Sequence, residues 1–151
     1  MHIMSVIDDI DRAIIKLLQI NPRISYTEIA KEIGFSRNAI KYRLKSLQEE
    51  GFLLGFRTVL DPRKFGKKIT AVISLKTELS QINHVKKILL EMPELLVVFQ
   101  VSGTYPFTVV GLFEDRDYLQ RFLDNDLSEL SISEFDVKII IDEIKDSDFT
   151  I

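Results

Sequence analysis

The side chains best suited to recognition chemistry lie between Gly34 and Gln48, a stretch with four basic residues and no acid. The basic residues are Arg37, Lys41, Arg43 and Lys45, and Asn38 adds an amide among them. Guanidinium and ammonium groups bind phosphates, while Arg and Asn form paired hydrogen bonds with guanine and adenine edges. This stretch therefore predicts contact with a nucleic acid.

Other kinds of chemistry have few residues available. The 151-residue chain has no cysteine, which excludes disulfides, thiolate metal sites and a cysteine nucleophile. It has two histidines, His2 and His84. Acid pairs such as Glu114 and Asp115 are better explained as helix caps or solvated side chains than as acid/base groups. We therefore expect no catalytic residue, no metal and no cofactor.

The charge is divided unevenly along the chain. Residues 1–68 hold 13 Lys/Arg and 8 Asp/Glu, a net charge of +5, whereas residues 69–151 hold 7 and 15, a net charge of −8. Such asymmetry indicates that the first half meets a polyanion and the second does not.

Three helices are expected to position the basic residues. The first has apolar residues at helical spacing (Ile7, Ile10, Ile14, Leu17 and Leu18) and stops at Asn21-Pro22. Ser25 and Glu28 have the spacing of a capping box that begins the second helix, which ends near Gly34. Ser36 caps a third helix that runs to about Glu50. Two short helices joined by a tight turn are typical of a helix-turn-helix, whose second helix lies in the DNA major groove.

The third helix has two distinct faces. Ile40, Leu44 and Leu47 cluster on one side and should face the core. The expected DNA-binding residues lie elsewhere, and they are Ser36, Arg37, Asn38, Lys41, Tyr42 and Lys45. Arg43 lies on the flank of the apolar stripe, so two roles stay open: contact with DNA, or pairing with an acid of the first helix.

The second half has the element order β-α-β-β-α-β after a connecting strand at 52–60 and a basic loop at 63–68, which either touches the DNA backbone or is a solvated turn. The strands are expected at 70–77, 95–101, 107–113 and 135–141, and the helices at 82–92 and 115–127. This order predicts a ferredoxin-like domain, a four-stranded antiparallel sheet with both helices on one face. The fold class is thus α+β. Val72 and either Val98 or Phe99 would remain on the other face, which favours a second copy as partner.

The chain resembles the Lrp/AsnC, or feast/famine, family of transcription regulators over nearly its whole length. The matching segments include Asp8-Asp9-Ile10-Asp11-Arg12, Arg23-Ile24-Ser25, Gly34-Phe35-Ser36, Glu49-Glu50-Gly51, Met92-Pro93-Glu94-Leu95 and Val101-Ser102-Gly103. The resemblance implies a helix-turn-helix DNA-binding domain at 1–52, a connecting strand and linker at 53–68, and an oligomerisation and effector domain at 69–151. It also implies homodimers on duplex DNA, and in many members rings of four dimers.

The effector site implied by the resemblance departs from the family pattern. A Gly-Asp-Tyr/Phe-Asp turn is replaced by Gly103-Thr104-Tyr105-Pro106, and a Thr-x-Thr segment by Phe135-Asp136-Val137. The amides near Gly103 and the Thr104 hydroxyl still suit a carboxylate, and Asp136 is the candidate partner for an ammonium. Two outcomes stay open: an amino acid or related small molecule bound with altered selectivity, or a regulator without an effector.

The expected function is sequence-specific DNA binding in transcription regulation, without enzymatic activity, in the cytoplasm and without a membrane partner. Two alternatives are kept. One is an enzyme like the siroheme decarboxylases related to this family, for which His84, Arg116 and Arg121 are the available side chains. The other is an amino-acid-binding protein that has lost DNA binding, and the basic third helix argues against it.

Overall fold

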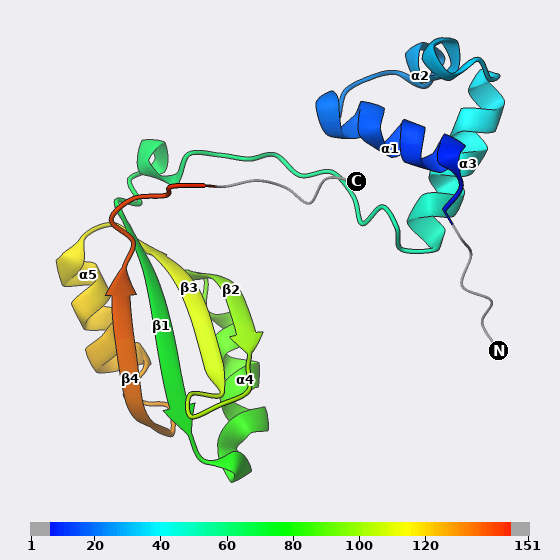
Figure 1. The fold of residues 1–151 in the computed structure, drawn as a ribbon. Coiled ribbons are helices and arrows are strands. Elements are labelled where there is room, and N and C mark those ends of the chain that lie inside the picture. The colour runs from blue at the N-terminus through cyan, green and yellow to red at the C-terminus, as the bar shows by residue number, and fades with distance from the viewer. Residues whose placement is uncertain (1–6, 146–151) are drawn as a thin grey trace. The chain divides into compact units, whose positions relative to one another are not determined.

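The computed structural model describes residues 7–145, which form two compact units divided between Val59 and Leu60 (Figure 1). His2 lies outside the described residues. Each unit has its own hydrophobic core, and the two clusters of buried residues share no member. The α+β class expected from the sequence is confirmed.

The first unit contains α1 (Asp9–Ile20), α2 (Tyr26–Ile33) and α3 (Arg37–Glu49). Capping boxes begin the first two helices, formed by Asp8 with Asp11 and by Ser25 with Glu28. Each box satisfies amides that have no partner within the helix. Gly34, with φ +79°, ends α2 in the left-handed conformation that allows the tight turn before α3. The core of this unit consists of Ile14, Leu18, Ile29, Ala30, Ile40 and Leu44.

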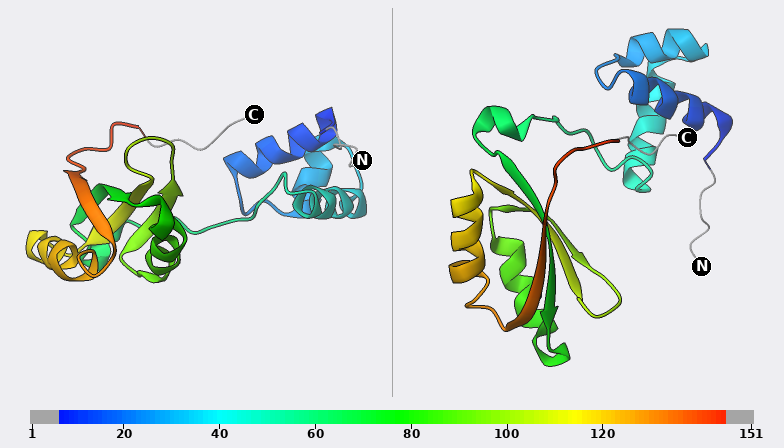
Figure 2. Two further views of the ribbon diagram at one scale, coloured as in Figure 1. Left: turned by 90° about the horizontal axis from the view of Figure 1, so that it is seen from below. Right: turned by 60° about the vertical axis from the view of Figure 1, so that its left-hand side comes forward.

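The second unit is an antiparallel sheet with strand order β2-β3-β1-β4. Along the chain its elements are β1 (Ile69–Thr77), α4 (Ile82–Glu91), β2 (Leu95–Gln100), β3 (Phe107–Phe113), α5 (Arg116–Arg121) and β4 (Ile132–Ile139). Both α4 and α5 cover the same face of the sheet (Figure 2). This is the expected ferredoxin-like arrangement.

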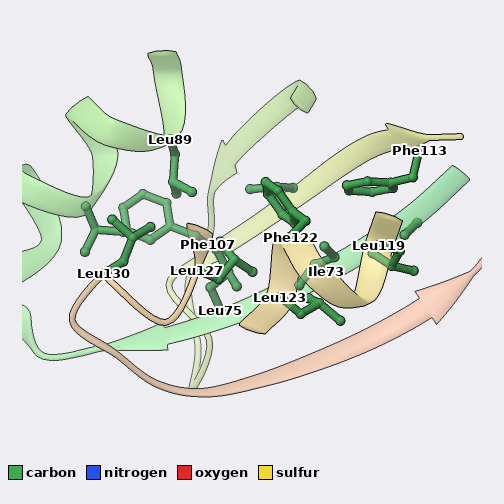
Figure 3. Packing of buried hydrophobic residues seen from close by; sticks show 13 residues of the cluster. Ile73, Leu75, Leu89, Phe107, Phe113, Leu119, Phe122, Leu123, Leu127 and Leu130 are labelled. Atoms are coloured by element: carbon green, nitrogen blue, oxygen red, sulfur yellow. The ribbon is translucent and has the colours of Figure 1, made fainter. Parts of the chain in front are cut away.

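The core of the second unit lies between the sheet and these helices (Figure 3). Alternate residues of β1 and β3 are buried there, as the two-residue period of a strand requires. Gly111 has the tightest surroundings: a Cβ at this position would lie 2.7 Å from the ring of Phe113. That ring packs in turn on Phe122, with centroids 5.1 Å apart. Gly111 therefore makes room for a buried aromatic pair.

The opposite face of the sheet carries an apolar row. The registers Val97↔Val110 and Val72↔Val110 align three valines across β2, β3 and β1, and on β4 the row ends at Lys138, opposite Val72. Phe99 lies on the same face and is 54% exposed. Of the two alternatives in β2, Val98 packs against the core, so Phe99 is the outward residue.

Three expectations about local structure were wrong. Residues 53–61 have no regular secondary structure, because a lone strand has no backbone partner within one chain. The helix expected at 115–127 changes after Arg121 into a π-helical turn, Phe122–Asp126. The last strand begins at Ile132, three residues earlier than expected, where a register shift lets Thr77 pair with Ile132.

Candidate functional site

The start of α3 is held by the side chain of Ser36. Its hydroxyl oxygen accepts a hydrogen bond from the Ala39 amide at 3.2 Å. The cap fixes the first turn, where Arg37 and Asn38 lie. It leaves the hydroxyl proton of Ser36 available to an acceptor outside the helix.

All six residues expected to bind DNA are exposed on or next to α3. They are Ser36, Arg37, Asn38, Lys41, Tyr42 and Lys45. Tyr42 is 75% exposed, which is unusual for an aromatic side chain with no partner surface. Ile40, Leu44 and Leu47 are buried, so the apolar stripe fixes which side of α3 meets the rest of its unit.

Lys45 forms an ion pair with Glu49, one helical turn away, at 3.5 Å between its Nζ and Glu49 Oε1. Both side chains are well exposed, 71% and 65%. An exposed pair of this kind contributes at most about 1 kcal/mol. Its ammonium can therefore exchange Glu49 for a phosphate at little cost.

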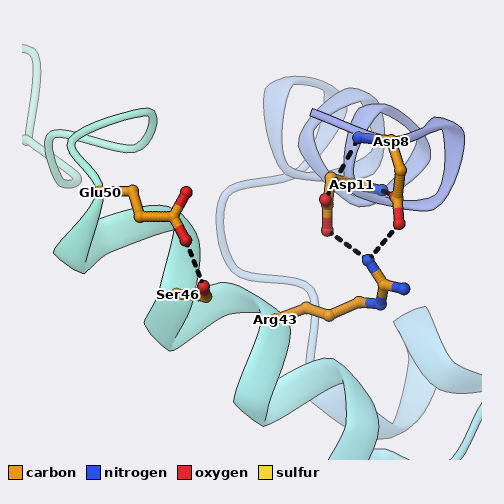
Figure 4. A network of polar contacts seen from close by, with 5 residues as sticks. All are labelled: Asp8, Asp11, Arg43, Ser46 and Glu50. Atoms are coloured by element: carbon orange, nitrogen blue, oxygen red, sulfur yellow. Dashed lines mark hydrogen bonds and ion pairs between the residues drawn. The ribbon is translucent and has the colours of Figure 1, made fainter. Parts of the chain in front are cut away.

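Arg43 takes the second of its two expected roles. One guanidinium nitrogen, Nη1, lies 2.7 Å from Asp8 Oδ2 and 2.8 Å from Asp11 Oδ1 (Figure 4). The pKa of the Asp8 carboxyl is lowered, first by the hydrogen bond from the Asp11 amide and then by Arg43. The pKa of Arg43 is raised by its hydrogen bonds to Asp11 and Asp8. Arg43 thus links α3 to the start of α1 through two ion pairs within the first unit.

Sequence reasoning did not find a cavity of about 300 Å³ beside this ion pair. Tyr42, Arg43 and Phe52 form part of its wall. A further wall group, the Glu50 carboxylate, accepts a hydrogen bond from Ser46 at 2.7 Å. The cavity is formed by side chains from α1, α3 and the segment after α3, so no local sequence pattern marks it.

The expected effector turn has a polar network at its end. The Tyr105 hydroxyl donates to Glu134 Oε1 at 2.7 Å, and Lys76 Nζ lies 3.0 Å from the other oxygen of the same carboxylate. The Glu134 pKa is lowered by Tyr105 and then by Lys76, while that of Tyr105 is raised by Glu134. Sequence reasoning missed Glu134 and Lys76, which meet only because β1 and β4 pair at this register.

The remaining residues of the expected effector turn are not part of the network of Tyr105, Glu134 and Lys76. Gly103, with φ +115°, and Thr104 are exposed, and the Pro106 carbonyl accepts the Val101 amide at 2.9 Å. Asp136 adds to the negative charge that raises the Tyr105 pKa, and its own carboxylate is paired with Lys138. The structure therefore brings Tyr105 and Asp136 toward one region, and Glu134 is the carboxylate that touches the turn.

Side chains suited to enzymatic chemistry are scattered in the second unit. His84 is exposed on α4, and the Arg121 guanidinium lies 5.6 Å from the ring centre of Tyr118 on α5. Across residues 7–145, no group of three or more His, Cys, Asp or Glu side chains is arranged to hold a metal ion. Within the same range, no helix has both the length and the apolar character to cross a bilayer.

A capped helix-turn-helix joined to a ferredoxin-like domain defines a two-domain class of DNA-binding regulator. Residues 7–48 match the AsnC-type helix-turn-helix domain, and residues 70–148 match the Lrp/AsnC ligand binding domain. The chain belongs to the Lrp/AsnC family of transcriptional regulators.

Relatives agree along almost the full chain. An HTH-type transcriptional regulator of Pyrococcus abyssi is 30% identical over 141 residues, covering 93% of this chain and 96% of the relative. The regulator Ptr1 of Methanocaldococcus jannaschii is 28% identical over 142 residues, with 93% and 96% covered.

Solved structures share the fold. AsnC from E. coli has a TM-score of 0.90 at 22% identity, covering 96% of this chain and 99% of that one. A transcriptional regulator from Neisseria meningitidis, solved as its L-Met complex, has a TM-score of 0.85 at 22% identity and covers 94% of both chains.

Proposed function

We propose that this regulator reads duplex DNA by placing α3 in the major groove. The observation that carries the proposal is the exposed face of α3, on which cationic and hydrogen-bonding side chains gather while the opposite stripe is buried. Arg37 and Asn38, in the capped first turn, are assigned to base edges. Lys41, Tyr42 and Lys45 divide between base edges and phosphates, and Ser36 donates to a phosphate.

Gel shifts over a range of salt concentrations test these roles. The probes are a duplex recovered by selection from a random pool with the unmodified protein, and a random duplex of equal length. Arg37→Ala or Asn38→Ala should weaken selected more than random binding, by about 1 to 3 kcal/mol each. Lys45→Ala should weaken both alike and reduce the salt slope by about 1. Unchanged binding in all three variants would refute the groove assignment.

We further propose that the chain forms homodimers through the outer face of the sheet, and that dimers assemble further, up to rings of four. The row Val97, Val110 and Val72 supports this, because an apolar sheet face without a helix layer favours a partner. Val110→Asp should convert the protein to monomers in light scattering at micromolar concentration. Thr108→Asp is the control, because it adds the same charge at a neighbouring outward position whose side chain is already polar. An unchanged mass for Val110→Asp would contradict the assignment.

The effector proposal concerns residues 103–106 with Asp136. An amino acid would place its carboxylate on the backbone amides around Gly103 and Thr104 and on the Thr104 hydroxyl. Its ammonium would lie against Asp136 or Glu134, in competition with Lys138 and Lys76. Thermal shift against the twenty amino acids tests this. A shift abolished by Thr104→Val supports the site, and no shift up to millimolar ligand supports a regulator without an effector.

We propose that the protein acts in the cytoplasm as a regulator and not as an enzyme. We also propose that its DNA-binding domain spans residues 1–52, its linker residues 53–68 and its oligomerisation and effector domain residues 69–151. The names of its relatives support regulation. An absorption spectrum of the purified protein tests the enzyme alternative, because a bound tetrapyrrole absorbs strongly in the visible range.

A further inference from the structure

We propose that Arg43 is a positioning residue for DNA recognition: its ion pairs with Asp8 and Asp11 set the orientation of α3. The inference rests on the proposed placement of α3 in the groove. Its basis is geometric, since one guanidinium nitrogen reaches two carboxylates that both belong to the start of α1. These carboxylates are themselves tied to each other's backbone amides by the capping box.

The ion pair restricts small rotations and shifts of α3 that the buried apolar stripe permits. Buried Ile40 and Leu44 fix one side of α3, but apolar contacts are not directional and tolerate small rotations and shifts. A guanidinium held by two fixed oxygens is directional. Arg43 lies six residues after Arg37, about 9 Å along the helix, so a small change of angle at Arg43 displaces the first-turn side chains from base edges.

The same ion pairs determine the net charge of the surface that α3 presents to DNA. With Arg43 engaged, the exposed face of α3 offers Arg37, Lys41 and Lys45 as cations. Arg43 also neutralises carboxylate charge at the start of α1, next to the recognition helix. The Asp11 side chain is only 16% exposed and that of Arg43 28%, so the pair is shielded from solvent more than the Lys45–Glu49 pair.

A variant of the acids separates positioning from direct phosphate contact. Asp8→Asn with Asp11→Asn keeps side-chain oxygens that cap α1, because Asn caps as well as Asp. If Arg43 bound phosphate, this double variant would release it and strengthen DNA binding with a steeper salt slope. If Arg43 positions α3, the ratio of selected to random affinity falls, by about tenfold, which corresponds to about 1.4 kcal/mol.

Arg43→Met provides the second measurement. Positioning predicts the same loss of ratio with the salt slope unchanged, whereas a phosphate contact predicts a slope reduced by about 1. Combining Arg43→Met with both Asn substitutions should add no further loss, because the groups act through one another. Arg43→Lys, which keeps the charge on a side chain that is one bond shorter and more strongly hydrated, should recover binding only in part.

All variants are measured at a temperature where calorimetry shows them folded. A role confined to stability would lower Tm and leave the affinity ratio of the folded protein unchanged, and that result overturns the proposal. A raised ratio in the double Asn variant overturns it as well. Lys45→Ala and Arg37→Ala in the same assay test the placement of α3 separately. If neither changes binding, the proposed function fails. If both weaken binding, the proposed function stands, and the results for the acid variants then decide only the role of Arg43.

Discussion

Replacing Ser36 with alanine tests whether the cap of α3 connects folding to recognition. The substitution removes the oxygen that accepts the Ala39 amide and leaves that amide to water. Loss of an N-cap side chain costs about 0.5 to 2 kcal/mol. Ser36 is exposed and its bond is 3.2 Å long, so water compensates in part and the lower half of that range applies.

A loss of about 0.5 to 1 kcal/mol should lower the Tm of the first unit by about 2 to 8 °C, given its small size. Calorimetry of the full chain measures this shift, and amide hydrogen exchange at Ala39 locates it. The Ala39 amide then has no acceptor in the helix, so its exchange should speed up by at least about two- to fivefold, the factor that corresponds to this loss of free energy. Affinity for the selected duplex should fall with it, because Arg37 and Asn38 lose their fixed backbone.

Two further substitutions separate the cap from the DNA contact. Ser36→Thr keeps a capping hydroxyl and should retain most of the stability and binding. Ser36→Asp also caps, so Tm should stay near that of the unmodified protein, but its negative charge should weaken DNA binding. An unchanged Tm and unchanged Ala39 exchange in Ser36→Ala would refute the reasoning.

Two other predictions concern packing and pH. Gly111→Ala should destabilise the second unit by about 1 to 3 kcal/mol, because its Cβ would lie 2.7 Å from the Phe113 ring, and adding Phe113→Leu should recover part of the loss in calorimetry; a gain in Tm for Gly111→Ala would contradict this. The lowered pKa values of Asp8 and Glu28 mean that their contribution to stability is present above about pH 4 and lost as pH falls through their folded-state values. Urea unfolding at pH 7 and pH 3 should show this loss in the first unit, and equal stability at both would count against it.

Local signals in the sequence were enough to predict much of the fold. Ser25 with Glu28, Gly34 and Ser36 each act within one helical turn, so the bounds of α2 and α3 could be predicted without knowledge of tertiary contacts. The exposed face of α3 followed from the same helical period. Arg43 lies on the flank of that period, and the choice between its two roles depended on contacts with α1.

The misses share a physical cause. Residues 52–60 have the composition of a strand, but a strand also needs a partner, which one chain does not provide here. Glu134 is far from Tyr105 in sequence. The two side chains form a hydrogen bond because β4 pairs with β1 and the turn that carries Tyr105 extends to the end of this pair. Which side chains cross a sheet depends on register, which no local pattern specifies at an edge strand.

The separation of the two hydrophobic cores has an evolutionary consequence. Substitutions in sites that share no contacts have additive effects, so a change in the core around Ile14 leaves the packing around Phe113 untouched. Substitutions in one core are therefore limited by the stability of that domain alone. The two domains can thus accumulate core substitutions at different rates, because a loss of packing in one is not compensated or worsened by the core of the other.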